Sequence, residues 1–223
     1  MQEVFIRQIE CIIDWFSSKL NGGNIWPVQF IISTHSSHIA NEAYFESIRY
    51  FLASADPARN SELRATRVAN LRKMFSRIPG PTRDFIHKYM TLTRCDLFFA
   101  DKAILIEGPS ERILLPKMIE KTDEELDKTK KLSSQYVAVM EVGGSYAHLF
   151  FKFLKFLEIP SLIITDIDSV HGPKRRACPV SKGEQTSNDS IRRWFRGHKI
   201  DMKPSSLIKL NSTEKISNNQ RLA

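Results

Sequence analysis

The sequence predicts an α/β fold in which a parallel sheet is flanked by helices and preceded by a mostly helical segment. Short apolar runs follow one another along residues 98–223, and stretches with helical periodicity separate them. Apolar strands that alternate with helices are typical of a parallel sheet covered on both faces. The 223 residues are 42% apolar and 26% charged, which is usual for a globular chain and leaves room for one large domain with a smaller neighbour.

The first part of the chain is expected to be mainly helical. Residues 4–20 repeat apolar positions at three- and four-residue steps, and Asn21-Gly22-Gly23 would end that helix. The apolar run 28–33 is expected to form a buried strand. Three further helices are expected over residues 36–52, 61–78 and 83–94.

The second part of the chain alternates strands with helices. The apolar runs predict strands at residues 103–107, 136–142, 161–166 and 205–210. The intervening periodicity predicts helices at residues 111–120, 145–159 and 189–196. Asn188 is expected to cap the last helix, because Asn is a favoured N-cap residue. Pro116 is expected to kink the first helix or displace its start.

Four carboxylates at strand ends form the strongest candidate site. Glu107 ends one expected strand and Glu111 lies one helical turn later, while Asp166 and Asp168 close another strand. The carboxyl ends of parallel strands meet at the edge where open α/β folds bind ligands. Converging carboxylates repel one another unless a cation lies between them, and oxygen ligands suit hard ions such as Mg²⁺ or Mn²⁺. The pattern therefore predicts a two-metal site of the kind that cleaves phosphodiesters.

These motifs resemble a known family. EGPSE at 107–111, then a strand, Gly143-Gly144, a helix and DID at 166–168, resemble a Toprim domain. The longer segments RCDLFFADKAILIEGPSE, VMEVGGSYAHLF, IPSLIITDID and TSNDSIRRWF are similar to the OLD family (overcoming lysogenisation defect). The resemblance implies a Toprim-type fold and a Mg²⁺- or Mn²⁺-dependent DNA endonuclease, joined to an ABC-type ATPase and acting in phage defence.

The upstream segment fits such a fusion. QFIISTHSSHI, at 29–39, looks like the strand and switch-histidine loop that end an ABC ATPase core, which implies that His35 senses the γ-phosphate of ATP. The sequence has no GxxxxGK[ST] loop, so ATP is expected to act only through an N-terminal ATPase region of a longer protein. The expected divisions are an ATPase tail, a basic helical insertion and a Toprim domain, at residues 1–50, 51–97 and 98–223.

Three further residues are weaker candidates. Glu141, at a strand end beside Gly143, is a metal ligand, a residue that supports one, or an acid that caps the turn. Lys215 falls where the family places a catalytic lysine, which would stabilise charge on the phosphate. A solvated lysine is an equal alternative. His171, three residues after Asp168, is a candidate base.

Basic residues gather in two blocks within a net charge of +8. Residues 49–94 hold ten Lys or Arg against three Asp or Glu, and residues 174–203 hold nine against three. Such blocks indicate a polyanion partner or a solvated helix face. We expect DNA to be the partner, and the first block to contact DNA or a second copy of the chain in a homo-oligomer. The expected phosphate contacts are Lys174, Arg175, Arg176, Arg192, Arg193 and Arg196.

Two other functions stay open: a Toprim ribonuclease acting on structured RNA, and a non-catalytic regulatory or oligomerisation module. No apolar run approaches the roughly 18 residues that a membrane span needs, so no membrane partner is expected. The three cysteines, Cys11, Cys95 and Cys178, lack metal-site spacing and fit a reducing cytoplasm.

Overall fold

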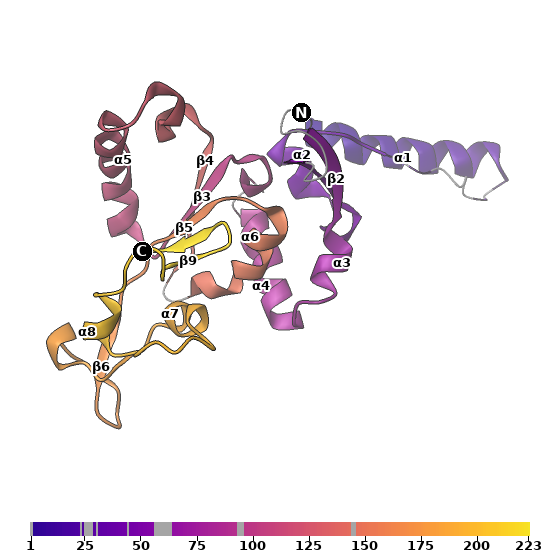
Figure 1. Cartoon of the computed structure of the whole chain (residues 1–223). Helices are drawn as coiled ribbons and strands as arrows, with labels where there is room; N and C mark the ends of the chain where they lie inside the picture. The colour runs from indigo at the N-terminus through magenta and orange to yellow at the C-terminus, as the bar shows by residue number, and fades with distance from the viewer. Residues whose placement is uncertain are drawn as a thin grey trace. The chain divides into compact units, whose positions relative to one another are not determined.

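The structure is a computed structural model, and it divides into two compact units, Met1–Phe99 and Ala100–Ala223. We call these the N-terminal and the C-terminal unit and describe each by itself (Figure 1). The residues that the structure describes are 2–22, 24, 29, 31–43, 45–55, 64–92, 96–143 and 146–223.

The N-terminal unit begins with a long helix, α1 (Gln2–Leu20), at the place that the apolar periodicity predicts. The helix ends at Leu20, and the turn that follows contains Gly22, whose φ of +59° suits a residue without a side chain. The other helical elements of this unit are α2 (Ser37–Glu42), η1 (Phe45–Ser47), α3 (Leu71–Phe75), α4 (Gly80–Leu92) and η2 (Asp96–Phe99). The strand expected at 28–33 is wrong for residues 29 and 31–33, which form no regular structure, while residues 28 and 30 lie outside the described part.

A β-hairpin replaces part of the expected helices of this unit. Strands β1 (Arg49–Ala55) and β2 (Arg64–Asn70) pair antiparallel, so the helices expected over 36–52 and 61–78 are wrong at these residues. The reason is a period of two: Leu52 and Ala69 are buried, while Phe51 and Val68 are exposed and lie opposite each other on the other face. The insertion expected at 51–97 is therefore a hairpin followed by helices.

The C-terminal unit is built on a five-stranded sheet, and this confirms the expected α/β fold with a mostly parallel sheet (Figure 1). The strand order is β4-β3-β5-β10-β9, with parallel pairing from β4 to β10 and an antiparallel edge strand β9. The strands are β3 (Lys102–Ile106), β4 (Val137–Glu141), β5 (Ser161–Ile163), β9 (Ile216–Ser217) and β10 (Gln220–Leu222).

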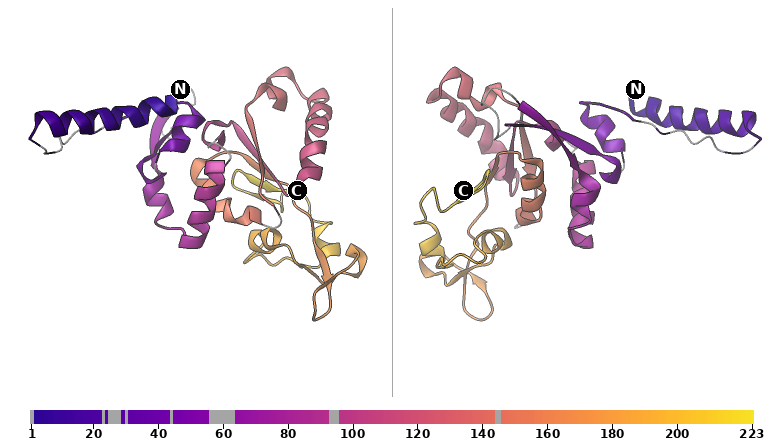
Figure 2. Two further views of the ribbon diagram at one scale, coloured as in Figure 1. Left: turned by 180° about the vertical axis from the view of Figure 1, so that it is seen from behind. Right: turned by 45° about the vertical axis from the view of Figure 1, so that its right-hand side comes forward.

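Helices cover both faces of this sheet. On one face, Leu115 of α5 (Pro109–Glu124) packs against Ile104 and Ile106 of β3. Helix α6 (Phe151–Leu157) lies on the opposite side of the sheet, and the two views in Figure 2 agree with this placement. Pro116 stands inside α5, which continues past it to Glu124. Short turns of 3₁₀ helix connect these elements: η3 (Lys128–Lys130), η4 (Leu132–Ser134) and η5 (Tyr146–Leu149).

A smaller three-stranded sheet follows the main one, with the order β7-β6-β8. Its elements and the helices beside it are β6 (Ser169–His171), β7 (Arg176–Ala177), η6 (Val180–Lys182), β8 (Gln185–Thr186), α7 (Asp189–Trp194) and α8 (Pro204–Leu207). The strand expected at 205–210 is wrong, because Pro204 opens a helix there and Leu207 is buried. None of the helices in the described part of the chain is long and apolar enough to cross a membrane.

Candidate active site at the carboxyl edge of the sheet

The order of the strands directs attention to one edge of the main sheet. From β3 the chain passes through α5 to β4 on one side, and then through α6 to β5 on the other side of β3. Strand order therefore reverses between β3 and β5, and open α/β sheets bind ligands at the carboxyl ends of strands where this happens. Glu107 directly follows β3, and Asp166 and Asp168 lie on the loop after β5.

Glu107 is held at this position by groups from two other segments. Its Oε1 accepts a hydrogen bond from the Thr165 hydroxyl, one of 3.0 Å from the Asn188 amide, and one of 3.3 Å from the Asp166 backbone N–H. Burial raises the pKa of the Glu107 carboxyl, and the charge of Asp168 adds to this increase. The three hydrogen bonds act in the opposite direction, because they favour the ionised form.

Asn188 is fully buried and connects the parts of this edge. Its Oδ1 caps α7 by accepting from the backbone N–H groups of Ser190 and Ile191, at 2.9 and 3.2 Å. Its Nδ2 lies 2.8 to 3.3 Å from four acceptors, which are Glu107 Oε1, Thr165 Oγ1, the Asp166 carbonyl and Asp168 Oδ2. An amide NH₂ has two hydrogens, so the four acceptors share them. One side chain thus fixes the start of α7 against both strand ends.

The loop that carries Asp166 and Asp168 is fixed through its backbone. Asp168 has a φ of +48°, a left-handed conformation that Asp tolerates better than most residues. Its carbonyl accepts from the N–H of Ser187 at 2.9 Å and from the Ser187 hydroxyl at 3.1 Å. The side chains of Asp166 and Asp168 are exposed. The loop therefore presents two carboxylates to solvent beside Glu107.

Glu111 and Glu141 already have partners in this structure. Glu111 accepts from the Gly108 N–H at 3.0 Å, an arrangement that stabilises the start of α5. Glu141 forms an ion pair of 2.7 Å with Arg112. Within the described ranges, no three His, Cys, Asp or Glu side chains gather closely enough to hold a metal ion. The expected convergence of four carboxylates is thus not present, and only Glu107 and Asp168 share a contact, the Asn188 amide.

Lys215 lies at the same edge of the sheet, two strands beyond β5. Leu222 of β10 pairs in parallel with Ile163, the last residue of β5, and its N–H donates to the Lys215 carbonyl at 2.9 Å. Lys215 therefore immediately precedes β9. Its side chain is half-buried.

The basic candidates occupy two exposed places in the C-terminal unit. Lys174, Arg175 and Arg176 lie at the turn between β6 and β7, where Arg175 has a φ of +47°. In the other place, Arg192 pairs with Asp189 at 2.8 Å, and Arg193 and Arg196 are exposed nearby.

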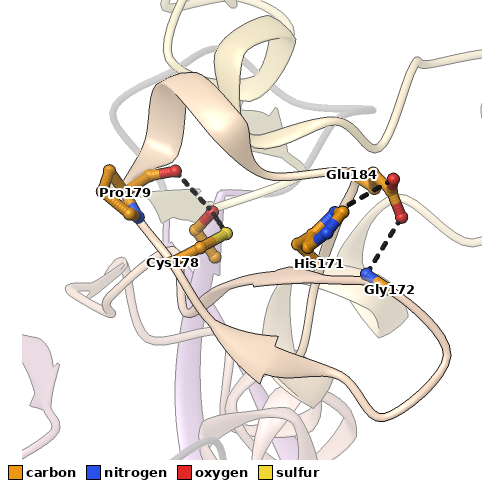
Figure 3. A network of polar contacts seen from close by, with 6 residues as sticks. His171, Gly172, Cys178, Pro179 and Glu184 are labelled. Carbon is orange, nitrogen blue, oxygen red and sulfur yellow. Dashed lines mark hydrogen bonds and ion pairs between the residues drawn. The ribbon is translucent and has the colours of Figure 1, made fainter.

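The two candidate histidines lie outside the carboxylate network. His171 Nδ1 lies 3.1 Å from Glu184, which also accepts from the Gly172 N–H, as Figure 3 shows. His171 thus contacts Glu184 beside the small sheet, and none of the carboxylates considered above is its partner. His35 is exposed, just before α2 of the N-terminal unit.

Sequence reasoning identified Asn188 as a helix cap and missed its contact with Glu107. The sequence does show an Asn at an expected N-cap, directly after Thr186 and Ser187, and this pattern indicates a capped helix. Nothing local to residue 188 indicates that its amide reaches a side chain 81 positions earlier. Thr165 was missed for the same reason, because its role depends on how β3 and β5 pair.

Comparisons with known proteins agree with this geometry. The family model described as "Overcoming lysogenization defect protein-like, TOPRIM domain" matches residues 98–168. A protein named Endonuclease GajA, from Bacillus cereus (strain HuB5-5), is 28% identical over 204 residues, which cover 87% of this chain and 28% of that protein. Another Endonuclease GajA, from Bacillus cereus (strain VD045), is 32% identical over 83 residues, or 37% of this chain and 13% of that protein.

The aligned part of this chain spans less than a third of the length of either relative. The family match covers β3, β4 and β5 together with the carboxylates that follow β3 and β5. Residues 98–168 thus form a Toprim domain that is similar to that of overcoming-lysogenization-defect proteins.

Proposed function

We propose that the C-terminal unit is a metal-dependent DNA endonuclease that hydrolyses phosphodiester bonds. The observation that carries the proposal is the linked set Glu107, Asn188 and Asp168 at the point where strand order reverses. The relatives named as endonucleases support the reaction class. These relatives are much longer than this chain. The use of ATP through His35 is therefore a proposal about a longer protein.

The donor set fits a hard divalent cation. The side chains that face this edge offer carboxylate oxygens, the ligands that Mg²⁺ and Mn²⁺ prefer. Glu107, Asp166 and Asp168 are the ligands we propose, and their carboxylates would have to move closer together to share an ion. Glu111 and Glu141 would first have to leave Gly108 and Arg112. A pair of bound ions would supply an activated water and stabilise the leaving oxygen.

The chain's own residues would prepare the site and the substrate. Asn188 holds Glu107 and Asp168 in place through its amide. Lys215 would stabilise charge developing on the phosphate, because it lies at the same edge of the sheet. The basic turn at 174–176 and the arginines of the 192–196 segment would contact the DNA backbone. We also propose that residues 1–50 are the tail of an ATPase core. The protein would form a homo-oligomer and act in the cytoplasm.

The direct test is cleavage of supercoiled plasmid by the purified chain. We expect nicking with Mg²⁺ or Mn²⁺ and none in EDTA, because the carboxylates need the cation to act. A structured RNA and a plasmid-binding assay run in parallel. Cleavage of RNA alone would favour the ribonuclease, and binding of DNA without cleavage by any metal would favour the non-catalytic module.

Neutral replacement of the arginines tests the proposed DNA contacts. The triple variant Arg192→Ala, Arg193→Ala, Arg196→Ala should make the plot of log K against log salt shallower by about 2, at about 0.9 for each lost phosphate contact. The value of about 2 counts Arg193 and Arg196 in full and Arg192 little, because Arg192 would exchange its pair with Asp189 for a phosphate. The charge-matched control replaces Lys121, Lys128 and Lys130, which are exposed elsewhere, and should keep the wild-type slope. An unchanged slope in the arginine variant would remove these residues from the interface.

A further inference from the structure

The N-terminal unit contains a cavity lined by arginines from three different elements. Its volume is about 560 Å³, in the range of small-ligand sites. Arg49 comes from the start of β1, Arg72 from α3 and Arg83 from α4. The remaining lining residues are Glu46, Ser47, Phe75 and Ser76. Among these described residues, one carboxylate faces three guanidinium groups, which gives this lining an excess of positive charge.

The contacts of these arginines leave most of that charge uncompensated. Arg49 donates to the backbone carbonyls of Glu46 and Ile48, at 3.0 and 3.1 Å, and these neutral acceptors orient the guanidinium without neutralising it. Arg83 lies 3.5 Å from Asp84, and both side chains are well exposed, so this pair is weak. Among the residues that the structure describes, none forms a hydrogen bond or ion pair with the Arg72 side chain.

The lining of the cavity also indicates which part of a ligand would enter it. Arg guanidinium groups recognise phosphate oxygens through paired N–H donors. Among the described residues of the lining, Phe75 is the one aromatic side chain, and at 2% exposed it offers no face on which a base could stack. The cavity therefore suits a phosphate group and lacks the means to hold a nucleobase.

We propose that this cavity binds a backbone phosphate of DNA and makes the N-terminal unit a second, sequence-independent contact for the substrate. The proposal rests on the proposed function, which supplies DNA as the polyanion. It assigns the contact to particular arginines within the basic block 49–94. The charge pattern of that block alone indicates only that the partner is a polyanion. The contact would be blind to base sequence, because phosphates position a duplex without reading it.

The test measures duplex binding in EDTA, so that cleavage plays no part. A labelled duplex is titrated at several salt concentrations with the wild-type chain, Arg72→Ala and the control Arg77→Ala. Arg77 is an exposed arginine on the same segment that does not line the cavity. We expect Arg72→Ala to weaken binding of all sequences alike and to lower the salt slope by about 0.9, the value for one phosphate contact. Arg77→Ala should retain the wild-type slope.

Two additional measurements make the outcome decisive. Arg72→Lys keeps the charge but not the paired donors, so it should keep the salt slope and bind more weakly than wild type. Pyrophosphate should compete with the duplex for the wild-type chain and much less for Arg72→Ala. If Arg72→Ala loses pyrophosphate binding but keeps wild-type duplex binding, the cavity serves a free phosphate ligand and the DNA contact is wrong. If neither changes, these arginines are a solvated surface and the proposal fails.

Failure of this proposal can be told apart from failure of the nuclease proposal. Duplex binding in EDTA can depend on Arg72 even if no metal supports nicking. Conversely, the chain can nick plasmid with Mn²⁺ even if Arg72→Ala leaves duplex binding unchanged.

Discussion

Glu107→Gln is expected to lower plasmid nicking by at least about a hundredfold while the chain stays folded. Loss of a group that merely supports a metal ligand costs about 10- to 100-fold, and a ligand itself should cost at least as much. Gln keeps an oxygen that can accept from the Thr165 hydroxyl, the Asn188 amide and the Asp166 N–H. The fold should therefore survive, and circular dichroism beside the nicking assay separates the two effects.

The stability of this variant has a predictable sign. Burial raises the pKa of Glu107 above its ordinary value of 4.5. The stability that such a carboxyl contributes is fully present below pH 4.5 and is lost as the pH rises through the folded-state pKa. At pH 7 in EDTA, Glu107→Gln should consequently unfold at a temperature no lower than that of the wild type.

Glu124→Gln, at an exposed position of α5, is the matched control and should nick at the wild-type rate. Wild-type nicking by Glu107→Gln would place the cation elsewhere. A large loss of folded structure in that variant would instead show that the ionised carboxylate is needed for the fold.

Asn188→Ala is expected to produce the largest loss of stability among single changes at this edge. Removal of an N-cap costs about 1 kcal/mol, and leaving buried acceptors without a donor costs about 1–3 kcal/mol more. The variant should therefore lose about 2–4 kcal/mol in denaturant unfolding. Asn70→Ala removes the cap of α3, which has a single bond of 3.3 Å to the Lys73 N–H. This control should lose only the capping contribution and keep its nicking activity.

Asn188→Ser separates the two roles of this residue. Ser caps a helix about as well as Asn, but it has no amide to reach Glu107 and Asp168. We expect nicking to fall about 10- to 100-fold and the Mn²⁺ concentration for half-maximal activity to rise. A purely structural role for Asn188 would leave that metal dependence unchanged. An unaltered Mn²⁺ requirement would thus contradict a positioning role.

The general fold and part of the candidate site follow from short sequence patterns. Runs such as AILI, at 103–106, are buried on both faces of the sheet, so their apolar character alone predicts a strand in a parallel sheet. Parallel strands bring their carboxyl ends to one edge, which is why Glu107 and Asp168 were expected together. Their arrangement around Asn188 depends on packing between segments far apart in the chain, and no local pattern encodes it.

The β1–β2 hairpin shows a different limit. Its two strands carry several arginines, and Val68 and Phe51 face solvent, so no continuous apolar stripe marks the buried face. Among the hairpin residues whose burial the structure describes, only Leu52 and Ala69 are buried, and two such positions are too few to outweigh the helical pattern of the basic stretch.

The position of β10 inside the main sheet has a consequence for how the protein folds. Lys102 of β3 finds Val137 of β4 across α5 and two short 3₁₀ helices. Gln220 of β10 must find Ser161 of β5 across the small sheet, η6, α7, α8 and β9. Pairings between distant segments close larger loops and form more slowly. We expect β3 and β4 to associate early and the edge beyond β5 to be completed late. Lys215, which immediately precedes β9, would then reach its place at this edge only when folding is nearly finished.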